Sequence, residues 1–149
     1  MTLDALDVET QQLRLKLRLA QLERVEESQK HFLPFVKSIW HEFIEGTHHR
    51  LIADKLERIA NGELKRLIVN MPPRHTKSEF ASFLFPAWMI GRRPDMKIIQ
   101  ATHTTELAVN FGRKVKNLLE TDEYKDIFPD TELAVDSKAS GRWDTNKGG

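Results

Sequence analysis

The chain has 149 residues, of which 40% are apolar and 30% charged, and its formal net charge is +1. This composition is typical of a soluble globular protein of about one domain, and it excludes a nucleic-acid or membrane partner that depends on bulk charge alone. The chain has no cysteine, which excludes disulfides and a cysteine-based zinc site and fits a reducing compartment. The N-terminus is acidic and polar, and no apolar run approaches the roughly 20 residues of a membrane span. We therefore expect an intracellular protein with no membrane partner.

The N-terminal part of the chain predicts a helix. Residues 8–30 are rich in Leu, Gln, Glu, Lys and Arg and contain no Gly or Pro. Leucines alternate with basic residues over 13–19, which is also a strand pattern, but β-branched residues are scarce and the flanks are strongly helical. An aromatic and apolar stretch follows at 32–44 and is expected to pack on the core. We assign residues 1–45 to an N-terminal helical segment.

Helical and strand patterns alternate in the rest of the chain. Thr47 is expected to cap a helix that ends at Asn61-Gly62, and Thr104 or Thr105 is expected to cap a later one. A further helix is expected from about Lys77 to Ile90. Arg66–Asn70 and Lys97–Thr102 are short apolar runs typical of buried parallel strands. The order predicts an α/β fold, a P-loop NTPase-like parallel sheet flanked by helices, at residues 46–149.

The loop after the first expected strand is the most informative motif. Met71–Ser78 reads Met-Pro-Pro-Arg-His-Thr-Lys-Ser, against the P-loop pattern G-x-x-x-x-G-K-[ST]. Lys77 and Ser78 stand in the expected places, but Met71 and Thr76 replace the two glycines. In such a loop, backbone N–H groups at the helix N-terminus face the phosphates, the lysine reaches the β- and γ-phosphates, and the serine hydroxyl binds Mg²⁺. The alternative is an ordinary loop whose lysine and serine are merely solvated.

These residues resemble a known family. Residues 43–50, 66–70 and above all 71–79 are similar to the ATPase domain of tailed-bacteriophage terminase large subunits, the motors that package DNA into procapsids. Loops of that family deviate from the standard form and carry an arginine. The similarity continues through Gln100–Leu119 and Arg142–Asn146.

The resemblance implies a site for ATP and Mg²⁺. It gives Arg74 a catalytic role in hydrolysis, assigns Mg²⁺ to Ser78, and places His49 near the family's adenine-contacting motif. Ala101–Glu106 resembles the segment that couples nucleotide state to DNA contact. The nucleotide-binding residues it implies are Pro73, Arg74, His75, Thr76, Lys77, Ser78, Glu79 and His49.

The resemblance also implies partners. They are double-stranded DNA bound without sequence preference, the portal protein, the small terminase subunit, and other copies in a homo-oligomeric ring. The implied location is the host cell cytoplasm and, transiently, the procapsid portal.

Two departures from the family pattern limit these expectations. Thr76 replaces the glycine before the lysine, where a side chain would crowd the phosphates. The Walker B strand is missing, since its only candidate, Leu133–Asp136, is too short and lacks a second acid, and the nuclease domain is missing too. We therefore expect the front part of a terminase, an incomplete ATPase domain that does not hydrolyse ATP efficiently alone. The alternatives are a non-catalytic adaptor or scaffold with a degenerate P-loop, and a helicase-like or nucleotide-kinase P-loop protein.

Overall fold

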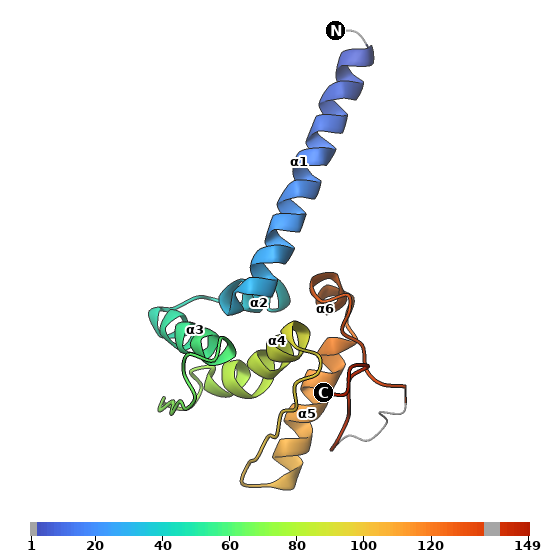
Figure 1. Ribbon diagram of the computed structural model, residues 1–149. Coiled ribbons are helices and arrows are strands. Elements are labelled where there is room, and N and C mark those ends of the chain that lie inside the picture. Colours follow the sequence, from blue (N-terminus) through green and yellow to red (C-terminus); the bar gives the residue numbers. More distant parts are fainter. Residues whose placement is uncertain (1–2, 136–140) are drawn as a thin grey trace.

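The computed structural model describes the backbone of residues 3–135 and 141–149, and the side chains from residue 7 onward (Figure 1). Its regular elements are helical throughout these ranges. They are α1 (Leu3–Lys30), α2 (Phe32–Ile39), α3 (Thr47–Ala60), the π-helix η1 (Glu79–Leu84), α4 (Phe85–Arg92), α5 (Thr105–Leu119) and α6 (Asp122–Ile127). Across the same ranges, β-pairing is limited to one antiparallel bridge between Leu133 and Thr145.

The predicted α/β fold is therefore wrong. Arg66–Asn70 and Lys97–Thr102, the expected parallel strands, form no ladder with any described residue. Their apolar side chains are also not covered on both faces, since Ile68 is 86% and Ile99 95% exposed. A buried strand needs neighbours that accept and donate its backbone hydrogen bonds. The apolar composition of these two segments is therefore not sufficient to make them strands.

An aromatic core holds the helices together. The Phe32 ring of α2 packs against Phe80 of η1 and against Phe85 and Trp88 of α4, with centroids 5.5–5.6 Å apart. Phe35 of α2 reaches α6, where it packs against Tyr124. Burial of large aromatic side chains, with edge-to-face contacts, is the main source of stability here.

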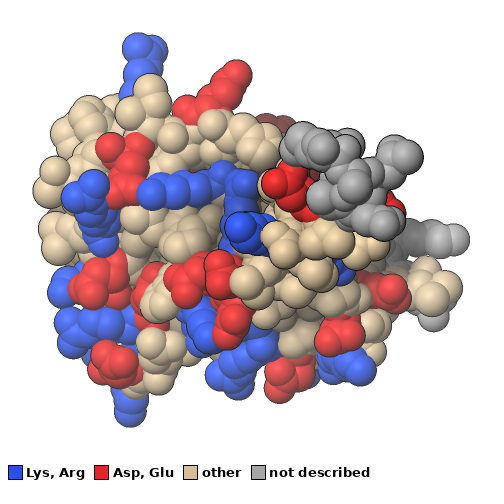
Figure 2. All heavy atoms as spheres, turned by 90° about the horizontal axis from the view of Figure 1, so that it is seen from above, with Lys and Arg blue, Asp and Glu red and all other residues tan. Residues whose placement is uncertain are grey.

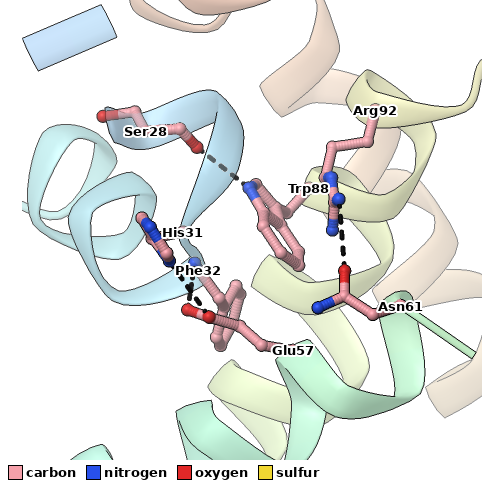
Figure 3. A network of polar contacts seen from close by, with 7 residues as sticks. All are labelled: Ser28, His31, Phe32, Glu57, Asn61, Trp88 and Arg92. Carbon is pink, nitrogen blue, oxygen red and sulfur yellow. Dashed lines mark hydrogen bonds and ion pairs between the residues drawn. The ribbon is translucent and has the colours of Figure 1, made fainter. Parts of the chain in front are cut away.

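Polar contacts join the helices around this core (Figure 3). The Trp88 indole N–H donates to the Ser28 carbonyl at 2.9 Å, which ties α4 to the end of α1. The N-terminus of α2 has no side-chain cap of its own. Glu57 of α3 supplies one, because its carboxylate accepts from the Phe32 N–H at 2.8 Å and contacts His31 Nδ1 at 3.1 Å.

Two helix starts were predicted with different success. Thr104 caps α5 as expected, since its hydroxyl accepts from the Leu107 N–H. In α3, however, the cap is Gly46 rather than Thr47. The Gly46 N–H donates to Nδ1 of His49 at 2.9 Å, so the histidine ring satisfies the N–H of the cap residue, while no described side chain accepts from the first turn of α3.

Helix α1 extends away from the rest of the molecule (Figure 1). Its helical prediction is confirmed, although it starts earlier than the pattern indicated. Residues 7–24 are exposed, and only its last turns, with buried Ser28, pack on the core. None of the helices in the described part is long and apolar enough to span a membrane.

Candidate phosphate-binding loop

The loop Met71–Thr76 lies between the irregular segment 66–70 and a helical run that begins at Lys77 and continues into η1 and α4. The Phe80 N–H donates to the Thr76 carbonyl at 2.9 Å, which makes Thr76 the residue from which the helix starts. A loop followed directly by a helix is thus the arrangement that the motif predicts. In the described part of the chain, however, no parallel sheet precedes the loop.

Two residues of the loop have a left-handed backbone. Arg74 has φ of 64° and Thr76 has φ of 58°. Such a conformation costs a non-glycine residue about 1–2 kcal/mol, and it is rare for a β-branched one. Turns of this kind direct successive N–H groups toward one point and form anion-binding concavities. Thr76 thus adopts the conformation for which a glycine normally stands at this position of a P-loop.

A chain of hydrogen bonds holds Thr76 in place. His49 Nδ1 accepts from the Gly46 N–H, so the neutral ring carries its proton on Nε2. That Nε2–H donates to Thr76 Oγ1 at 2.7 Å, and Thr76 Oγ1 donates to the His75 carbonyl at 2.7 Å. The chain runs from the start of α3 to the loop, and it fixes both the threonine rotamer and the peptide that follows His75.

The His49 ring is itself firmly packed. It is only 5% exposed, and it stacks on Phe80 at 5.1 Å and meets Phe43 edge-on at 4.8 Å. Burial, and secondly the neighbouring His48, lower the pKa of His49 below its ordinary value. The neutral tautomer that the hydrogen-bond chain requires is therefore the favoured one. His49 faces the loop, and its ring is covered from solvent.

The charged groups of the loop face solvent. Arg74, Lys77 and Ser78 are exposed, whereas Thr76 is half-buried. An anion at the loop would meet two cationic side chains, a hydroxyl and the helix N-terminus together. Mg²⁺ bound to that anion could use the Ser78 hydroxyl. These groups can bind and polarise a phosphate.

The remaining predicted residues play different parts. The exposed Pro73 offers its carbonyl, which accepts from Nδ1 of the equally exposed His75 at 2.9 Å. Glu79 is half-buried and pairs with Lys114 of α5 at 3.0 Å. Lys114 also lies over the ring of Phe83, 5.5 Å from its centroid. The start of η1 is thus connected to α5.

Helix η1 directly follows the loop. In its wider turn the Phe85 N–H donates to the Phe80 carbonyl, five residues back. Short π-helical segments are rare, and those that occur are often found at functional sites. Phe80 belongs both to this turn and to the stack on His49.

The sequence-based prediction missed three contributors, Gly46, Phe80 and Lys114. A Cβ at Gly46 would come within 2.9 Å of the exposed His48 ring, which would have to move aside. His49 and Thr76 are 27 residues apart, and no spacing rule connects them. The last residues of Ala101–Glu106 line an open groove of about 650 Å³ along the first turns of α5, and no residue of Met71–Ser78 is among the residues that line it. Asp136, the only acid in the Walker B candidate, lies outside the described residues.

Comparison of the chain with models of protein families, with curated proteins and with solved structures found no match. In the described part of the chain, no three His, Asp or Glu side chains are grouped so that they could hold a metal ion by themselves.

Proposed function

We propose that Met71–Ser78 binds the triphosphate of Mg²⁺-ATP, and that this chain is the nucleotide-binding front part of a DNA-packaging motor of the terminase large-subunit kind. The observation that carries the proposal is the left-handed backbone of Arg74 and Thr76 immediately before a helix N-terminus. Left-handed residues in such a turn can direct successive N–H groups toward an anion at the helix N-terminus, which supports the proposal.

Each side chain has a role in this proposal. Lys77 neutralises the β- and γ-phosphates, and the Ser78 hydroxyl binds the Mg²⁺ that bridges them. Arg74 approaches the γ-phosphate, where charge changes during hydrolysis. His49 holds Thr76 and acts through it as a positioning residue, without itself touching the nucleotide.

The wider assignment rests on the family resemblance. Double-stranded DNA, a portal protein, a small terminase subunit and a ring of copies are the partners we propose, in the host cytoplasm and at the portal. Figure 2 shows basic and acidic side chains interspersed on the face seen along α1, with no extended patch of one sign. DNA would therefore have to use another surface or a local cluster.

Equilibrium binding of a fluorescent ATP analogue tests the proposal. We expect saturable binding that depends on Mg²⁺ and that Lys77→Ala abolishes. Lys65→Ala is the matched control, because Lys65 is also exposed and lies just before the loop segment. Binding that survives Lys77→Ala, or that both variants weaken equally, would contradict a site at this loop.

One observation favours a second candidate, a non-catalytic adaptor. Helix α1 exposes several leucines away from the core, and such a surface suits a binding partner. A folded chain that binds no nucleotide would leave this adaptor as the better explanation.

A further inference from the structure

The exposed part of α1 carries a line of apolar side chains. Val8, Leu15, Leu19 and Leu22 are each more than half exposed. At 3.6 residues per turn they lie within about 60° of one another around the helix axis. Together with Gln12 they occupy the a and d positions of a heptad repeat, with Val8, Leu15 and Leu22 at d and Gln12 and Leu19 at a. We refer to these five residues as the α1 seam.

The body of the protein does not obstruct this seam. Glu26 and Lys30, which continue the same side of α1 toward the core, pair with each other and have side chains 61% and 59% exposed. The buried contact of α1 is made by its last turns, at Ser28, whose carbonyl accepts from Trp88. Ser28 lies more than 120° around the axis from the centre of the seam. A second helix can therefore approach along the whole seam.

We propose that α1 forms a parallel, two-stranded coiled coil with α1 of a second copy of this chain, with the α1 seam as its core. Leu15 and Leu22 occupy d positions, as leucines do in two-stranded coiled coils, and a polar residue at one a position, here Gln12, favours one register. The inference does not depend on nucleotide binding.

The charges beside the seam indicate the partner and its direction. In a parallel pair, Arg18 at position g faces Glu23 of the other copy at position e, twice by symmetry, and Gln11 faces Lys16 without repulsion. The antiparallel register that sets Leu15 against Leu19 brings Lys16 to Lys16, Arg18 to Arg18 and Glu9 to Glu23. Like charges oppose one another at each of those places. Antiparallel registers that oppose unlike charges, such as the one that brings Glu9 to Lys16, set Leu15 against Gln12. The parallel, in-register pair sets each leucine of the seam against a leucine and pairs Arg18 with Glu23, so it is the direction that we propose.

Two matched double variants test the seam. Sedimentation equilibrium of the full chain should show a mass that rises with concentration from 17.3 kDa toward twice that value. Leu15→Lys with Leu19→Lys should weaken pairing by at least about tenfold in Kd, because two charges would enter the apolar seam. Leu13→Lys with Leu17→Lys alters equally exposed leucines on the opposite side of α1 and should leave pairing intact.

The direction is tested by a single cysteine, since the natural chain has none. Leu15→Cys places two thiols opposite each other in the parallel pair, within disulfide reach, whereas Leu17→Cys points outward. We expect a rapid, oxidant-dependent dimer of Leu15→Cys only. Arg18→Glu should weaken the pair, and adding Glu23→Arg should restore it.

The proposal is overturned by a chain that is monomeric at all concentrations, or by equal effects of the two lysine double variants. Cross-linking of Leu17→Cys as fast as Leu15→Cys would also overturn it. Residues 7–24 do not pack on the core, so all variants should keep the thermal midpoint of the unaltered chain at a concentration where it is monomeric.

Discussion

At the scale of single residues, the loop depends on how Thr76 is held in a conformation that normally requires glycine. The His49 ring contributes the hydrogen bond to Thr76 and stacks on Phe80. It therefore stabilises both the loop and the first turn after it.

His49→Ala should lower the free energy of unfolding by about 2–4 kcal/mol, because a buried ring and two hydrogen bonds are lost. Urea denaturation measures this change. His48→Ala removes a neighbouring but exposed ring and should cost less than about 0.5 kcal/mol. Equal losses of unfolding free energy in the two variants would show that His49 contributes no more to stability than the exposed His48.

The same histidine makes stability depend on pH. Its folded pKa is depressed below the ordinary 6.5, through burial first and then the charge of His48, while Glu45 acts in the opposite direction. The other titratable ring nearby is that of His75, whose centroid lies 6.1 Å from the centroid of His48. A depressed histidine pKa means that the unfolded chain binds more protons in acid. The His49 contribution is therefore complete above pH 6.5 and is lost as pH falls through the folded pKa.

Unfolding free energies measured by urea across pH 5 to 8 should show this loss, and His49→Gln should remove that part of the slope. His48→Gln should reduce the slope, because the repelling charge is gone. A slope unchanged in His49→Gln would assign the pH dependence to other groups.

At the scale of the elements, Glu57 joins α3 to the start of α2 (Figure 3). Glu57→Ala should cost about 1–2 kcal/mol of stability, because the α2 N-terminus loses its cap from another helix. Glu63→Ala is the control, since the Glu63–Arg58 pair at 3.5 Å is a surface contact of small value. Chemical denaturation compares the two, and a control loss as large as that of Glu57→Ala would mean that the cap contributes nothing beyond charge.

The sequence predicted helices well where one face repeats along the chain. In α5, Phe111, Val115 and Leu118 recur on one face and are buried, whereas Leu107, on the same pattern, is only partly buried, and Thr104 is the cap. The strand predictions were wrong because they rested on local composition. Arg66–Asn70 has the composition of a strand, but a strand also needs a paired neighbour, which composition does not reveal. The loop could be located from Lys77 and Ser78, but the bond between His49 and Thr76 is a tertiary contact without a local pattern.

At the scale of the whole molecule, the extended segments leave apolar side chains uncovered. Leu67 and Val69 pack partly against the core, whereas Ile68, between them, is exposed, as is Ile99. Apolar side chains on backbone without a ladder favour association between chains.

Replacing Ile68 and Ile99 together by threonine should raise solubility and leave the thermal midpoint nearly unchanged. Val69→Thr keeps the same shape but places a hydroxyl against the core, so it should lower the midpoint by several degrees. Precipitation assays and thermal melts distinguish the two. A midpoint that falls as far in the isoleucine variant as in Val69→Thr would show that these isoleucines are covered in solution.

The most direct test of nucleotide binding at the loop is an NMR titration of the ¹⁵N-labelled chain with Mg²⁺-ATP. Backbone amides from Arg74 to Glu79 are the predicted ligands, so their resonances should shift first and most, and Lys77→Ala should suppress those shifts. No shift in a folded sample would contradict the account. So would shifts confined to another region, such as the groove along the start of α5.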